Sequence, residues 1–319
     1  MNEQSPFSVA DGRPISHLKF QNADVTADGE QRAHVSLTQL DTLWFNTGTL
    51  CNLACKNCYI ESSPTNDALV YLTLSEVLQY LDEIAGEGLP TREIAFTGGE
   101  PFMNPDFMAM LELCLTRGFD VLVLSNAMRP MRRFEKDLLQ LPNRDNLTIR
   151  VSLDHFTQEV HEAERGPNSW DKAIDGLIWL TENSFKTAIA GRHLGQESIS
   201  DAREGYAKLF QKHAMNIDPE NEAELALFPE MDATLDTPEI TTSCWQILDV
   251  DPESIMCANS RMVVKRKGEQ TPRVAACTLL PYDPQFDMGD TLVESSQNVK
   301  LNHPHCSRFC VLGGASCSA

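Results

Sequence analysis

The sequence predicts an α/β protein: a partial barrel of six strand–helix units, resembling a TIM barrel, with a small cysteine-rich extension. Strand-like and helix-like segments alternate from about residue 40 to residue 232, the order typical of parallel strands with helices outside them. Beyond that point, prolines, cysteines and short β-like runs replace the alternation. We therefore expect a polar N-terminal segment over 1–39, a barrel over 40–232 and a metal-stapled module over 233–319.

Local patterns give the elements of the barrel in order. Thr73-Leu-Ser-Glu76 is a capping box that opens a helix ending near Gly88. The apolar run 121–124 is typical of a buried parallel strand. Strands are expected at 43–45, 94–96, 121–124, 147–153, 186–190 and 224–228. Further helices are expected over 105–117, 131–139 and 170–180, and from Ser200 as N-cap to about 213.

Charge and hydropathy exclude several classes of protein. The chain has 46 acidic and 26 basic residues, a net charge of −20, and no basic stripe of the kind that nucleic-acid-binding proteins carry. It has no apolar stretch of about 18 residues, so we expect no membrane span. The first 30 residues lack the layout of a secretory signal and are polar, so we expect a cytoplasmic protein whose N-terminus is mobile to about Gln31.

The ten cysteines are distributed unevenly. Three lie at 51–58, one at 114 and six between 244 and 317. In a long chain without a secretory signal, such clusters more often bind metal or take part in redox chemistry than form disulfides. Cys114 lies among apolar helical residues and is expected to be a core residue.

The first cysteine group follows the first strand of the predicted barrel. Cys51-x3-Cys55-x2-Cys58 places three thiolates on one loop, enough for three irons of a cubane, and leaves the fourth iron open to a chelating small molecule. A structural zinc site with a distant fourth ligand is the alternative.

This loop resembles the signature of the radical S-adenosylmethionine (SAM) superfamily, in which the open iron binds SAM and one electron cleaves it to a 5′-deoxyadenosyl radical. Asn57 stands where that signature usually has an aromatic residue, and Tyr59 follows the last cysteine. Three further motifs resemble the family's SAM-binding positions in the order in which they occur: Gly98-Gly99-Glu100, Ser125-Asn126, and Ser152 with Arg165.

The resemblance implies roles for these residues. Glu100 would hold the SAM amino group, and Ser152 and Arg165 would contact its ribose and carboxylate. An Arg fork matches a carboxylate bidentately, although Arg165 alone would more often form a surface ion pair. Arg192 and His193 follow the fifth strand and can also face the cavity.

The C-terminal cysteines resemble the twitch domain, a shortened SPASM domain with one auxiliary cluster. The candidate metal ligands are Cys257, Cys277, Cys306, Cys310 and Cys317, of which Cys317 can replace one of the others. Four thiolates suffice for a second [4Fe–4S] cluster, and a structural zinc site is the alternative.

The resemblance implies an enzyme that cleaves SAM and abstracts hydrogen from a small-molecule or peptide substrate. An auxiliary cluster would aid oxidation or cross-linking, and a flavodoxin or ferredoxin would supply electrons. Two other classes stay open: a non-catalytic iron–sulfur electron carrier or sensor, and a zinc-stapled interaction module. The motifs around Glu100 and Arg165 argue against an electron carrier, which would not need them.

Overall fold

The computed structural model describes residues 13–193, 197–229 and 232–317. Its largest feature is a curved sheet with eight strands. The barrel strands are β2 (Thr42–Asn46), β3 (Glu93–Thr97), β4 (Asp120–Ser125), β5 (Leu147–Ser152), β6 (Lys186–His193) and β7 (Leu225–Pro229). The sheet continues with β8 (Ser260–Val264) and β9 (Arg273–Ala275).

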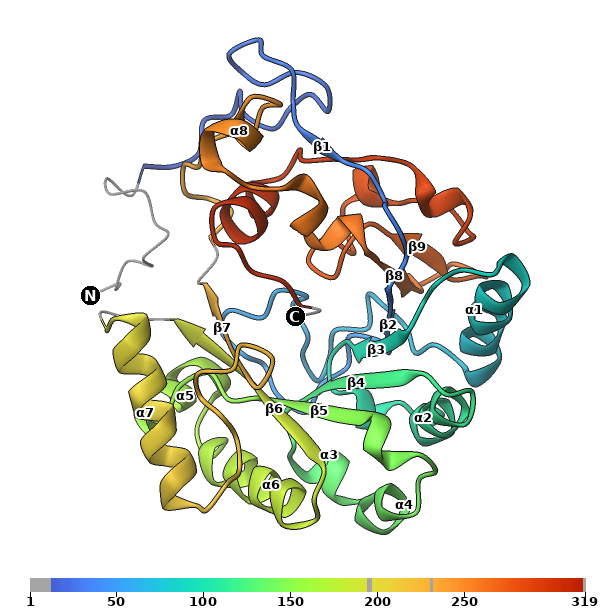
Figure 1. Cartoon of the computed structure of the whole chain (residues 1–319), viewed down its shortest axis with the longest axis vertical. Helices are drawn as coiled ribbons and strands as arrows, with labels where there is room; N and C mark the ends of the chain where they lie inside the picture. The colour runs from blue at the N-terminus through green and yellow to red at the C-terminus, as the bar shows by residue number, and fades with distance from the viewer. Residues whose placement is uncertain (1–12, 194–196, 230–231, 318–319) are drawn as a thin grey trace.

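The strand order is β7-β6-β5-β4-β3-β2-β8-β9. Neighbours run parallel from β7 to β8, and β9 pairs antiparallel with β8. Figure 1 shows the sheet bending around the centre of the molecule, with helices outside it. The expected six-stranded partial barrel is therefore confirmed.

The helices cover the outer face of the sheet. They are α1 (Leu74–Glu87), α2 (Phe107–Thr116), α3 (Arg129–Arg132), α4 (Glu135–Leu139), α5 (Gln158–Arg165), α6 (Trp170–Glu182) and α7 (Ile199–Lys212). The capping box at Thr73 and Glu76 is present, and Gly88 ends α1 in the left-handed conformation.

Two expectations about helices were wrong, and one helix was not predicted. Ser198, not Ser200, caps α7, because its hydroxyl and the carboxylate of Asp201 form a capping box there. The single helix expected over 131–139 is two short ones, because Phe134 leaves helical geometry and its ring packs near that of Phe102. The helix α5 was not predicted, because it buries few side chains and so lacks an apolar period.

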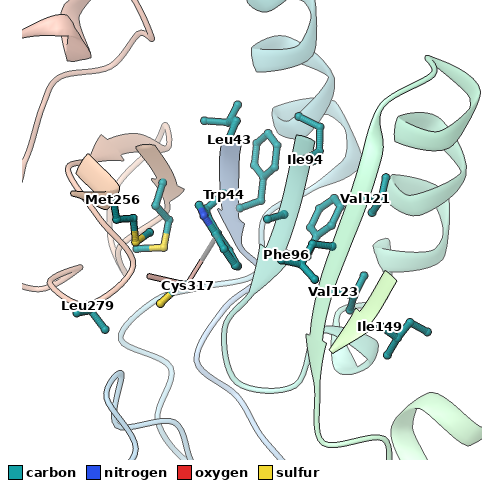
Figure 2. Packing of buried hydrophobic residues seen from close by; sticks show 14 of the residues in the cluster. Leu43, Trp44, Ile94, Phe96, Val121, Val123, Ile149, Met256, Leu279 and Cys317 are labelled. Carbon is teal, nitrogen blue, oxygen red and sulfur yellow. The ribbon is translucent and has the colours of Figure 1, made fainter. Parts of the chain in front are cut away.

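Alternation along each strand separates two layers of the core. Phe45 and Phe96 face the helices, and the ring of Phe96 meets that of Phe107 on α2 edge to face. Trp44 points to the other face of β2, toward Met256 and Cys317 of the C-terminal module (Figure 2). Successive strand residues point to opposite faces, so β2 packs against the outer helices on one face and against the C-terminal module on the other.

The C-terminal residues are joined to the barrel through the sheet. β8 pairs parallel with β2, with Leu43 opposite Arg261 and Trp44 opposite Met262. Beyond the sheet lie α8 (Cys244–Leu248), β10 (Val299–Lys300), which pairs with β1 (His34–Val35), and a π-helix over Cys306–Val311. The division of the chain near residue 232 stays a prediction.

The described part of the N-terminal segment packs against the C-terminal module. Pro14 forms a β-bridge with Leu235, and the buried Arg32 forms an ion pair with Glu239. This packing of residues 13–31 differs from the mobility that we expected there. Residues 1–12, for which we also expected mobility, lie outside the described ranges. None of the helices in those ranges has the length and apolar composition that crossing a bilayer requires.

Candidate functional site

The loop after β2 brings its three thiols to one cavity. Cys51, Cys55 and Cys58 all line it, at the carboxyl ends of the barrel strands. Backbone amides of Leu53 and Ser62 donate to the sulfurs of Cys51 and Cys58, at 3.4 and 3.3 Å. Such donors stabilise sulfur that carries negative charge.

Burial opposes ionisation of these thiols. It raises the pKa of Cys51 to about 12 and also raises the pKa of Cys55, although the charge of Arg165 acts in the opposite direction on Cys55. Among the described residues, no three His, Cys, Asp or Glu side chains stand placed to bind one metal ion. The fit to a cluster rests on the donor set, three soft thiols facing a shared cavity.

Two glycines let the end of β3 pack directly under this loop. A Cβ atom on Gly99 would lie 2.1 Å from the carbonyl oxygen of Leu50, and one on Gly98 would lie 2.6 Å from that of Gly48. Gly98 also has a φ of +137°, which favours glycine. Both glycines line the cavity, yet the close approach that requires them is to the backbone preceding Cys51.

Glu100 lies behind the cavity wall rather than in it. Its carboxylate accepts hydrogen bonds from the hydroxyl of Ser125 (2.9 Å) and the amide of Asn126 (2.9 Å), and both of those residues line the cavity. Burial raises the pKa of Glu100 to about 7, against the lowering effect of these donors. In this structure Glu100 ties the end of β3 to the end of β4.

Arg165 reaches the cavity from the end of α5, where Asp154 holds its guanidinium. Nε and Nη2 of Arg165 donate to the two carboxylate oxygens of Asp154 at 2.9 and 2.8 Å. Burial, the largest single effect, lowers the pKa of Arg165, but the charge and hydrogen bonds of Asp154 together with the charges of Cys55 and Cys58 raise it above its ordinary value. Part of the fork expected to hold the SAM carboxylate is therefore engaged within the protein.

A second polar group holds the cysteine loop to α5. The side-chain amide of Asn57 donates to Glu164 at 2.9 Å, and Arg192 on β6 donates to the same carboxylate at 3.2 Å. The guanidinium of Arg192 also lies 5.4 Å from the ring centroid of Tyr59, within cation–π range. Asn57, which departs from the aromatic residue of the family signature, thus fixes the loop to a neighbouring helix.

The C-terminal module supplies the wall opposite the strand ends. Its lining residues are Thr278, Leu279, Phe309 and Cys317. The ring of Phe309 stacks on Phe228 at the end of β7 (5.7 Å) and meets Tyr59 edge to face (6.3 Å). Rings from the cysteine loop, the last barrel strand and the C-terminal module therefore meet at one place.

The remaining C-terminal thiols gather within the module. Burial raises the pKa of Cys310, and the charges of Cys306, Cys277, Cys257 and Cys317 raise it further. Cys306 and Cys310 lie about one turn apart on the π-helix. Short π-helical segments often occur at functional sites.

Cys317, which also acts on Cys310, and Cys244 make further contacts. The sulfur of Cys317 accepts from Thr278 at 3.3 Å and faces the cavity, and that of Cys244 contacts Thr241.

The structure brings most of the candidate residues together. The following line the cavity: Cys51, Cys55, Cys58, Tyr59, Gly98, Gly99, Ser125, Asn126, Ser152 and Arg165. Arg192 lines it as well, whereas His193 contacts the carbonyl of Glu197. The roles of Asp154 and Glu164 were not predicted. Their signal in the sequence is weak: Asp154 follows the fourth strand, and Glu164 directly precedes Arg165.

The fold and the site define a (β/α)6 barrel protein with a three-thiol loop at the carboxyl ends of its strands. The sequence model of the radical SAM superfamily matches residues 45–209. The chain therefore belongs to the radical SAM superfamily. Membership implies SAM and a [4Fe–4S] cluster as cofactors.

Two curated relatives match part of the chain. The subtilosin biosynthesis protein AlbA of Bacillus subtilis is 34% identical over 116 residues, 36% of this chain and 25% of AlbA. The mycofactocin maturase MftC of Mycobacterium tuberculosis is 28% identical over 135 residues, 42% of this chain and 33% of MftC. The matched region thus spans a quarter to a third of these relatives.

Solved structures share the fold. Streptococcus suis SuiB bound to its precursor peptide SuiA superposes with a TM-score of 0.58 at 12% identity, over 82% of this chain and 66% of SuiB. The structure of anSMEcpe with bound AdoMet gives a TM-score of 0.57 at 15% identity, over 82% of this chain and 81% of that one. At these identities the likeness concerns the fold alone.

Proposed function

We propose that this chain cleaves SAM reductively and abstracts a hydrogen atom from a substrate held in the same cavity. One observation carries the proposal: a single cavity is lined by the three thiols, by the ends of β3 to β6 and by Arg165 with its partner Asp154. The C-terminal module closes the far side of this cavity. A non-catalytic electron carrier would have no use for a cavity of this kind beside its thiols.

Each group of residues has a role in that chemistry. When bound, the [4Fe–4S] cluster supplies the electron that splits SAM into methionine and a 5′-deoxyadenosyl radical. Cys51, Cys55 and Cys58 would hold the cluster, and Asp154 would orient Arg165 toward the SAM carboxylate. The apolar wall of Leu279 and Phe309 keeps water from the radical.

We propose a second [4Fe–4S] centre held by Cys257, Cys277, Cys306 and Cys310. Support for this set comes from the order of the effects on the pKa of Cys310: the charges of Cys306, Cys277 and Cys257 act more strongly than that of Cys317. Cys317 then forms part of the cavity wall. A structural zinc site uses the same four ligands, and the iron content of anaerobically purified protein distinguishes the two.

We propose a peptide as the substrate, and a flavodoxin or ferredoxin in the cytoplasm as the electron donor. Support for the peptide comes from the names of the relatives: a bacteriocin biosynthesis protein, a mycofactocin maturase and a fold neighbour solved with a precursor peptide. Mass spectrometry of candidate peptides incubated with the reduced enzyme and SAM tests this. A small molecule, rather than any peptide, consumed in step with SAM would contradict it.

Formation of 5′-deoxyadenosine from SAM by reconstituted, reduced protein tests the central activity. The wild type should form it, and the triple variant Cys51→Ala, Cys55→Ala, Cys58→Ala should not. Cys114→Ala, a fully buried thiol on α2, is the matched control and should retain activity. Equal product from the triple variant would contradict the proposal.

A further inference from the structure

Arg261 is a fully buried arginine beside the C-terminal thiols. Its guanidinium donates to the carbonyl oxygen of Cys257 at 2.6 Å, and to those of Ser260 and Ser295 at 2.8 and 2.9 Å. A weaker contact of 3.4 Å reaches the carbonyl of Gln297. The side chain lies on β8, four residues after Cys257, so the strand that extends the barrel sheet also fixes this cation.

All four of these acceptors are neutral carbonyls. Within the described residues no carboxylate lies within 4.0 Å of the guanidinium, and the ionisable groups whose charge acts on it are the thiols of Cys257 and Cys277. The fully buried Arg32, by contrast, forms an ion pair with Glu239. A buried charge is strongly destabilising unless an opposite charge compensates it. Because no carboxylate in the described part of the chain fills that role for Arg261, we expect the compensating negative charge to lie at the thiols.

We propose that Arg261 supplies the compensating positive charge for the auxiliary centre and thereby raises its reduction potential. This inference rests on the proposed function, which places a [4Fe–4S] cluster on Cys257, Cys277, Cys306 and Cys310. Four thiolates give such a centre a net charge of about −2, and one added electron makes it about −3. Because Arg261 interacts more strongly with the more negative state, it favours the reduced form. Arg261 is a positioning and tuning residue, with no contact to substrate.

The test compares Arg261→Lys with Arg261→Gln. Both side chains keep hydrogen-bond donors for the surrounding carbonyls, but only lysine keeps the charge. Each change is made in full-length protein that also carries Cys51→Ala, Cys55→Ala and Cys58→Ala, so that only the auxiliary centre gives a signal. The readout is a potentiometric titration followed by electron paramagnetic resonance. We expect Arg261→Lys to titrate near the parent, and Arg261→Gln to show at least a tenfold lower ratio of reduced to oxidised centre at the parent's midpoint. For one electron, tenfold corresponds to about 59 mV.

Arg273→Gln is the matched control. Arg273 lies in the same hairpin, but its charge is already neutralised by Asp287 at 2.7 Å and Asp290 at 2.6 Å, and it is partly exposed. Arg273→Gln should therefore leave the midpoint potential of the auxiliary centre unchanged.

Each outcome has a separate meaning. Equal midpoints for Arg261→Gln and Arg261→Lys, at equal iron content, would overturn the role of Arg261 and leave the proposed function intact. A parent protein without the three core cysteines that takes up no iron would instead contradict the auxiliary cluster itself.

Discussion

The carboxylate of Glu100 joins two strand ends through Ser125 and Asn126. We expected this residue to receive the SAM amino group, and the structure places it behind the cavity wall. The motif Gly98-Gly99-Glu100 marks the correct strand end, but the partners of Glu100 come from β4, about 25 residues further along the chain. Its burial therefore depends on tertiary packing, which the local sequence does not contain.

Glu100 should make stability depend on pH near neutrality. Folding raises its pKa from its ordinary value of 4.5 to about 7, so the folded state binds the proton more tightly. The associated stabilisation is complete below pH 4.5 and is lost as pH rises through about 7. Between pH 6 and 8 the free energy of unfolding of the wild type should fall relative to that of Glu100→Gln, by at most ~1.4 kcal/mol per pH unit. Denaturant titrations measure this, with the exposed Glu87→Gln as control. Parallel pH profiles for the wild type and Glu100→Gln would contradict the pKa assignment.

Arg165 should contribute to SAM affinity through its guanidinium. A hydrogen bond to a charged group contributes about 1.5–3 kcal/mol, so its loss should weaken SAM binding about tenfold or more. Removing Arg165 alone would leave Asp154 buried without its partner, so the test is the double variant Arg165→Met with Asp154→Asn. Isothermal titration with SAM, at matched iron content, measures the effect. Asp154→Asn alone keeps the guanidinium and should lose less affinity; unchanged binding in the double variant would return Arg165 to a purely structural role.

Among the elements, the junction between β3 and the cysteine loop sets the position of the thiols. The loop runs directly over Gly98 and Gly99, with the amide of Gly99 donating to the carbonyl of Gly48 at 2.7 Å. At the other side, α5 holds the loop through Glu164. The sequence predicted the loop and the strand, but α5 was missed because it is mostly polar. The hydrogen bond from Asn57 to Glu164 on this helix was therefore not predicted either.

Gly99→Ala should therefore displace the cysteine loop. Its Cβ would meet the backbone of Leu50, which cannot move without shifting Cys51. We expect the variant to bind about four irons per chain rather than about eight and to form no 5′-deoxyadenosine. Gly86→Ala, where a Cβ meets nothing within 4 Å, is the control. Full iron content and activity in Gly99→Ala would show that the loop does not depend on this contact.

At the scale of the whole molecule, one continuous sheet connects the two groups of thiols. The alternation of segments predicted the six barrel strands, because each strand buries its own apolar run. The pairing of β8 with β2 was not predicted, because it joins residues more than 200 positions apart and leaves no local pattern. For the same reason the sequence did not reveal that Leu279, Phe309 and Cys317 would line the cavity.

This arrangement predicts a division of labour between the two groups of thiols. Cys257→Ala with Cys277→Ala should leave slow formation of 5′-deoxyadenosine, because Cys51, Cys55, Cys58 and the cavity-lining strand ends lie in the barrel. Conversion of the substrate should be lost. Loss of metal can unfold a small module, so circular dichroism and the iron count of the remaining centre are the controls. Normal substrate turnover in the folded double variant would make the C-terminal metal purely structural.

The most direct measurement of the central claim is the electron paramagnetic resonance spectrum of the reduced protein with and without SAM. If Cys51, Cys55 and Cys58 hold a cluster with an open iron that binds SAM, one of two signals should change on adding SAM. That signal should be absent from the triple variant Cys51→Ala, Cys55→Ala, Cys58→Ala. A spectrum unaltered by SAM, or a SAM-responsive signal that persists in the triple variant, would contradict the assignment of this loop as the SAM-binding centre.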